Sequence, residues 1–130
     1  MNKDIVKLNI PKKPSYISLV RLTASGIAYE LGLNIDEIED IKVSIGEACI
    51  NSLSFIEEDE ISLIFEIEDN KLSIKVSGVK ENIPEMLDEK RERELGLLII
   101  KSLMDEVIFN EDGIEMIKYI EDDSQWPLVL

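Results

Sequence analysis

The stretch Ile41–Phe55, with the sequence IKVSIGEACINSLSF, limits the fold more than any other part of the chain. Apolar and small residues recur there at intervals of three and four, the spacing of one face of an α-helix. Polar residues recur in the same way on a second face, where Glu47 and Asn51 stand one turn apart. This polar stripe consists of Asp40, Ser44, Glu47, Asn51, Ser54 and Glu58. The stretch therefore predicts a helix with one buried face, and its polar stripe either meets water, as in most amphipathic helices, or lines a ligand site.

The rest of the chain shows two kinds of spacing. Alternation of apolar and polar residues predicts strands at 4–10, 60–68, 71–77, 105–109 and 114–120, with tight turns at Asp69–Asn70 and Asn110–Gly113. Helical spacing predicts helices at 15–31, from Asn34 or Asp36 to about Ile56, and at 94–104. Asp36 and Glu39 have the spacing of a capping box.

This order of elements indicates a two-layer α/β (α+β) sandwich. A mixed, mainly antiparallel sheet with three helices on one face accounts for every apolar stripe. Residues 1–121 are expected to form a single domain, and 122–130 a C-terminal tail. The tail contains Trp126, which either folds back onto the body or meets another chain.

Composition excludes several classes of function. The net charge of −14 argues against a nucleic-acid or anionic-membrane surface and favours a basic protein partner. With one cysteine and no histidine, the chain has no internal disulfide, no zinc site of the usual kinds and no Ser–His or Cys–His nucleophile. Cys49 lies on the apolar side of its helix and is predicted to be a core residue. No signal peptide or membrane-spanning segment is evident, which predicts a cytoplasmic protein.

Four segments carry a resemblance to a known family. IEDIKVSIGEACINSL resembles the second helix of the anti-sigma factor serine/threonine kinases, which belong to the histidine-kinase, gyrase and heat-shock-90 ATPase superfamily. SLVRLTASGIA, LGLLIIKSLMDEV and DGIEMIKYI extend this resemblance over nearly the whole chain. The resemblance implies the histidine-kinase-like ATPase (Bergerat) fold.

The resemblance also implies roles for individual residues. In the family, the glutamate at the Glu47 position is the proposed general base toward a serine hydroxyl, and the asparagine at the Asn51 position binds the Mg²⁺ of ATP. Leu95, Gly96 and Leu97 correspond to a glycine motif where a helix N-terminus offers free N–H groups to the phosphates. Arg93, like Arg91 just before it, could reach a phosphate from the segment that forms a lid in the family.

The sequence departs from the family where adenine would bind. The family has an aspartate and spaced glycines, D-x-G-x-G, after the third strand. Here Gly78 takes the aspartate position, and Lys80 and Asn82 take the glycine positions. The lost hydrogen bond is worth ~1.5–3 kcal/mol, and a water or the hydroxyl of Ser77 is the remaining candidate acceptor. Glu94 also replaces a glycine beside the triphosphate. These changes weigh against ATP binding and more heavily against catalysis, so whether the protein is an enzyme stays open.

Three functions follow as hypotheses. The first is an anti-sigma-factor-like regulatory protein that binds a sigma factor or an anti-anti-sigma protein, with Leu19, Leu22 and Tyr29 as spare apolar residues for a partner. The second is an active ATP-dependent serine kinase that phosphorylates an anti-anti-sigma factor. The third is a non-catalytic, metabolite-binding descendant of the fold. A homodimer is expected because family members often dimerise.

Overall fold

A computed structural model describes residues 3–121 of the chain. The C-terminal tail at 122–130, with Trp126, lies outside the described residues. The elements in chain order are β1 (Asp4–Pro11), the short 3-10 helix η1 (Pro14–Tyr16), α1 (Ile17–Glu30), α2 (Ile35–Phe55), β2 (Glu60–Ile67), β3 (Lys71–Ser77), α3 (Lys90–Leu103), β4 (Glu106–Asn110) and β5 (Gly113–Tyr119).

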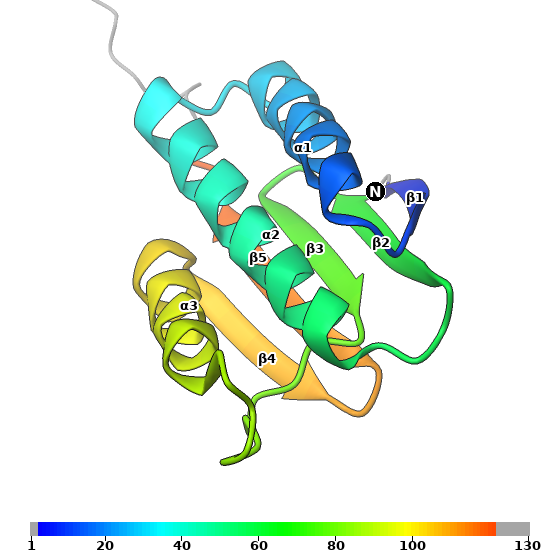
Figure 1. Ribbon diagram of the computed structural model, residues 1–130. Helices are drawn as coiled ribbons and strands as arrows, with labels where there is room; N and C mark the ends of the chain where they lie inside the picture. Colours follow the sequence, from blue (N-terminus) through cyan, green and yellow to red (C-terminus); the bar gives the residue numbers. More distant parts are fainter. Residues whose placement is uncertain (1–2, 122–130) are drawn as a thin grey trace, which may run out of the picture.

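The five strands form one sheet in the order β1-β2-β3-β5-β4, and each neighbouring pair is antiparallel. Figure 1 shows all three helices on one face of this sheet, with α2 between α1 and α3. The predicted fold class, a two-layer sandwich with three helices on one face of a mainly antiparallel sheet, is confirmed.

The core lies between the sheet and the helices. Alternate residues of the central strands are fully buried there, as the sequence pattern predicts: Ile61, Leu63, Phe65, Leu72, Ile74 and Met116. The helices contribute residues at three- and four-residue spacing, which include Val20, Ala24, Ile41, Ile45, Ala48 and Cys49. Cys49 is therefore a core residue, and burial raises the pKa of its thiol to about 12 against the opposing effect of nearby Arg21.

The N-cap of helix α2 is Asn34, one of the two predicted starting positions, but the capping box of this helix and the start of α3 differ from the sequence prediction. The capping box of α2 is formed by Asn34 and Glu37, two residues before the predicted pair Asp36 and Glu39. Helix α3 begins at Lys90, a full turn before the predicted start at Glu94. The ion pair between Lys90 and Glu94, at 2.5 Å and one turn apart, supports this extra turn. Among residues 3–121, none of the helices combines the length and the apolar character needed to cross a bilayer.

Candidate functional site

The polar stripe of α2 lies mostly inside the molecule. Ser44 is fully buried, Asn51 is only 2% exposed, and Glu47 is half-buried. The interpretation of this stripe as a solvated helix face is therefore wrong for its central part, and only its end at Ser54 and Glu58 is exposed. The stripe packs against α3 and against the loop that follows β3.

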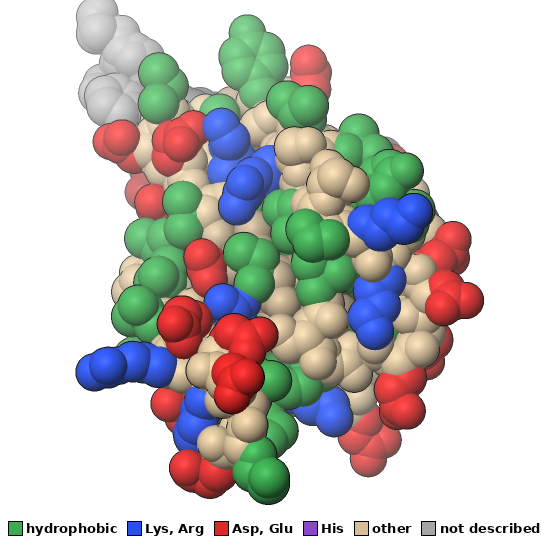
Figure 2. All heavy atoms as spheres, viewed as in Figure 1, with side chains coloured by type: hydrophobic (Ala, Val, Ile, Leu, Met, Phe, Trp, Pro, Cys, Tyr) green, Lys and Arg blue, Asp and Glu red, His purple; other side chains and the backbone are tan. Residues whose placement is uncertain are grey.

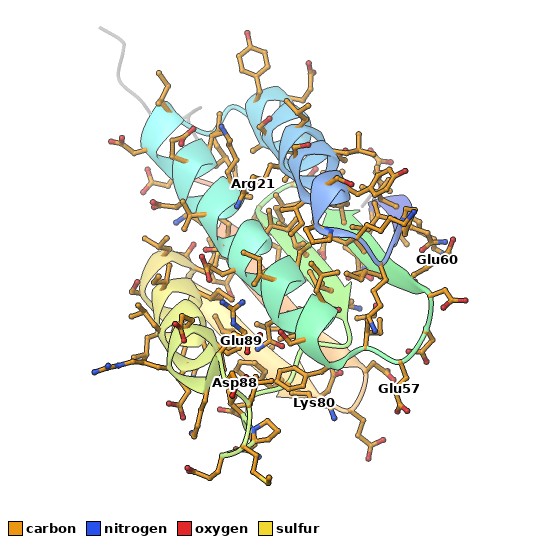
Figure 3. The ribbon with its side chains drawn as sticks, viewed as in Figure 1. Arg21, Glu57, Glu60, Lys80, Asp88 and Glu89 are labelled. Carbon is orange, nitrogen blue, oxygen red and sulfur yellow. The ribbon has the colours of Figure 1, made fainter. Side chains whose placement is uncertain are left out.

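The carboxamide of Asn51 is held by the backbone of one residue. Its Nδ2 donates a hydrogen bond to the carbonyl oxygen of Lys80 at 3.1 Å, and the Lys80 N–H donates to Oδ1 at 3.0 Å. This reciprocal pair, which we call the Asn51–Lys80 clasp, fixes the orientation of the side chain and pairs both of its polar groups. The Lys80 ammonium also lies 5.7 Å from the ring centroid of Phe55, near the C-terminal end of α2 (Figure 3).

The residues just before Lys80 are also bound tightly to α2. The Ser52 hydroxyl donates to the Ser77 carbonyl at 2.6 Å. Gly78 has a φ of 78°, and a Cβ built there would lie 2.8 Å from both Ser52 Oγ and Ile56 Cβ. A side chain therefore does not fit at the position where the family has its aspartate. The Ser77 hydroxyl accepts from the Ser62 N–H at 2.8 Å, so it points to β2.

The loop after Gly78 adds apolar side chains to the core. Val79 is 3% exposed and Ile83 is 8% exposed, and both belong to the main hydrophobic cluster. Because these residues are buried together with Asn51, the loop folds inward onto α2 as a part of the domain's packing.

Glu47 and Gly96 bring α2 and α3 close together. A Cβ on Gly96 would lie 2.5 Å from Glu47 Oε1, so glycine is what permits this approach. Leu97 is buried beside it, whereas Leu95 is 56% exposed. Because α3 begins at Lys90, the N–H groups of Leu95, Gly96 and Leu97 lie beyond the first turn and bond within the helix. The resemblance implies free N–H groups at Leu95–Leu97. In this structure the motif lies inside α3, so its N–H groups are not free.

A cavity between α1, α2 and the start of α3 is lined by two arginines. Arg21 from α1 and Arg93 from α3 line one cavity of about 680 Å³, and Figure 3 shows Arg21 between α1 and α2, with Glu89 at the start of α3. Arg91 is exposed and is not among the lining residues. Arg21 was missed by sequence reasoning; the available signal was Gly46, a glycine inside a helix that leaves space for a neighbouring side chain.

A second cavity lies at the far end of α2 and is acidic. It has a volume of about 470 Å³ and is lined by Glu57, Glu58, Glu60, Glu111 and Asp112, among others. Within residues 3–121, no group of carboxylates and cysteine is arranged to hold a metal ion.

Comparison of the sequence with known proteins identifies the family of this chain. Residues 10–118 match the model of the histidine kinase-like ATPase domain. Serine-protein kinase RsbW of Staphylococcus epidermidis is 36% identical over 144 aligned positions, which cover 94% of this chain and 91% of that protein. RsbW of Staphylococcus aureus strain MRSA252 is 34% identical with the same coverage. Since the alignments are longer than the 130 residues of this chain, the relatives contain residues with no counterpart here. The chain belongs to the histidine kinase-like ATPase family, within the group of serine protein kinases that its sequence resembles.

Proposed function

We propose that this chain is an anti-sigma-factor-like regulatory protein that binds a sigma factor or an anti-anti-sigma protein in the cytoplasm. Similarity to serine-protein kinase RsbW over 94% of the chain supports the class of protein. The Asn51–Lys80 clasp is the observation that favours a binding protein over a kinase, because it occupies the side chain expected to hold the metal.

Mg-ATP, the cofactor of the family, does not fit these residues in the expected way. Gly78 offers no carboxylate to adenine, and its surroundings have no space for one. Both polar groups of Asn51 are paired, and the N–H groups of Leu95–Leu97 lie inside α3. We therefore propose that the fold, and the surface that binds a partner, persist without nucleotide.

Helix α1 offers a surface for the partner. Leu19, Leu22 and Tyr29 are 45%, 68% and 72% exposed, and Figure 2 shows hydrophobic side chains along the α1 edge of the molecule. Exposed apolar side chains that gather on one face are typical of protein interaction sites. The net charge of −14 favours a partner with a basic surface and disfavours nucleic acid and anionic membranes. The same apolar face is also suited to contact a second copy of the chain. Light scattering on the purified chain measures whether such a homodimer forms.

The test is binding of the purified chain to the sigma factors and anti-anti-sigma proteins encoded in the same genome. We expect a complex to form in the absence of nucleotide. Leu22→Asp should weaken it about tenfold or more, because it places a charge in an apolar contact. Met86→Asp is the matched control, since Met86 is 93% exposed and lies outside α1. Failure of every candidate partner to bind, or binding only with Mg-ATP, would refute the proposal.

An active serine kinase is the second candidate, and Glu47 favours it. This carboxylate is half-buried beside Gly96, in the position of the family's general base. Incubation with labelled ATP, Mg²⁺ and the anti-anti-sigma protein distinguishes the two. Transfer of label that is lost in Glu47→Gln would establish the kinase, whereas we expect no transfer.

A further inference from the structure

Helix α3 presents apolar side chains to the outside of the molecule. Leu95 and Leu98 are 56% and 62% exposed, and Ile99 and Leu103 are partly buried. These four residues recur at intervals of three and four, so they lie on one side of the helix, and we call them the α3 apolar face. Figure 2 shows hydrophobic side chains on the side of the molecule formed by α3. Exposed apolar side chains that adjoin one another are typical of a surface that another segment covers.

The end of β5 is held against the end of α3 by hydrogen bonds. The Lys118 ammonium donates to the carbonyl oxygen of Leu103, the last residue of α3, at 3.1 Å. The Tyr119 N–H donates to Oδ2 of Asp105, which lies just beyond the same helix end, at 2.7 Å. The C-terminal tail, residues 122–130, therefore begins beside the C-terminal end of α3.

The C-terminal tail is long enough to run along α3. Its nine residues span up to about 30 Å when extended, and Trp126, the fifth of them, reaches up to about 16 Å from the end of the described chain. Along the helix axis, Leu95 lies only about 12 Å from Leu103. Trp126 can therefore contact Leu98, and the residues after it can contact Leu95.

The tail complements α3 in both polarity and charge. It contains the acidic pair Asp122 and Asp123 and then the apolar run Trp126–Leu130, with the sequence WPLVL. Helix α3 carries four basic and two acidic residues, whereas α2 carries one basic and five acidic residues and α1 carries one of each. In a chain with a net charge of −14, α3 is thus the helix best suited to an acidic segment with an apolar run.

We propose that the C-terminal tail of this chain packs on the α3 apolar face, with Trp126 against Leu98. The tail runs from the C-terminal end of α3 toward its N-terminal end, so that the residues after Trp126 cover Leu95. The contact removes an indole ring and two leucine side chains from water, which favours the packed form. The proposal is independent of the proposed regulatory function, because it concerns a contact within one chain and its test requires no partner protein.

The test follows the fluorescence of Trp126, which is the one tryptophan of the chain. The reference is a peptide with the sequence of residues 120–130 in the same buffer. We expect the full chain to show blue-shifted emission and weaker quenching by acrylamide than the peptide, because packing shields the indole from water. Dilution should leave the emission unchanged. Emission equal to that of the peptide would overturn the proposal, and a blue shift that disappears on dilution would overturn it by assigning the tail to a second copy of the chain.

A matched pair of substitutions locates the contact on α3. Leu98→Asp should lower the equilibrium constant for packing of the tail about tenfold or more, because it removes an apolar contact and places a charge there. The emission of Trp126 should then approach that of the peptide. Leu22→Asp is the control, since Leu22 is 68% exposed on α1 and Figure 1 shows α2 between α1 and α3. If Leu98→Asp left the emission unchanged, or if both substitutions changed it equally, the proposal would fail.

Nuclear Overhauser effects test the same contact without any substitution. In the unsubstituted chain, the indole protons of Trp126 should show cross-peaks to the methyl groups of Leu95 and Leu98. The methyl groups of Leu22 on α1 and of Ile35 at the start of α2, which is 78% exposed, should show none. Cross-peaks to these methyl groups in place of those of α3 would show that the tail packs elsewhere and would overturn the proposal.

Discussion

Two sides of helix α2 differ in whether their polar groups have partners within the chain. On one side, Asn51 and Ser52 hold the backbone of Lys80 and Ser77, so these groups are satisfied within the chain. On the other side, Arg21 and Arg93 face a cavity without an ion-pair partner among residues 3–121. The first side is closed by the loop after β3, and the second side borders an open cavity. Asn51, a candidate metal ligand by resemblance to the family, thus has a structural use in this chain.

The contrast predicts that stability depends more on the closed side than on the open side. Hydrogen bonds to a buried backbone contribute to folding, and their loss leaves unsatisfied groups behind. Arginines without a partner contribute little to folding, so their removal should be tolerated. Substitutions on each side of α2 separate these two effects.

The largest effect is expected from Gly78→Asp, which restores the family's aspartate. We expect a loss of about 3 kcal/mol in the free energy of unfolding, because the residue would need a positive φ and its Cβ would clash with Ser52 and Ile56. Urea denaturation measures this loss. Lys80→Gly restores a family glycine at a position whose side chain is exposed. It should lower the free energy of unfolding by less than about 1 kcal/mol. A stable Gly78→Asp protein that gains ATP binding would show that this side is not closed.

A smaller effect is expected from Asn51→Ala. The substitution removes both hydrogen bonds of the clasp and leaves the N–H and carbonyl of Lys80 unpaired. We expect the free energy of unfolding to fall by about 2–3 kcal/mol. Ser54→Ala, one turn away and exposed, should change it by less than about 0.5 kcal/mol. If Asn51→Ala were as stable as this control, the clasp would have no structural role.

The smallest effect on stability is expected from the open side. Arg21→Gln and Arg93→Gln should each change the free energy of unfolding by less than about 0.5 kcal/mol, because neither arginine has an ion pair to lose. A large loss of stability in either variant would mean that these arginines are structural.

Local spacing was sufficient for most of the fold but for only part of the site. Alternation identified the buried faces of β2 and β3, and the position of Glu47 and Asn51 on one helix face followed from helical geometry. The clasp could not be predicted, because Asn51 and Lys80 are 29 residues apart and the contact depends on how the loop packs. The early start of α3 was missed because the charged run from Glu89 to Glu94 shows no apolar stripe. Arg21 resembled any polar residue of an amphipathic helix until Gly46 was found beside it.

The most direct test of this account is an NMR titration of the chain with Mg-ATP that follows the Asn51 side-chain NH₂ signals and the Lys80 backbone amide. We predict that these signals stay in place up to millimolar Mg-ATP. Saturable movement of the Asn51 and Lys80 signals would contradict the account, because it would mean that nucleotide opens the clasp and occupies the closed side of α2.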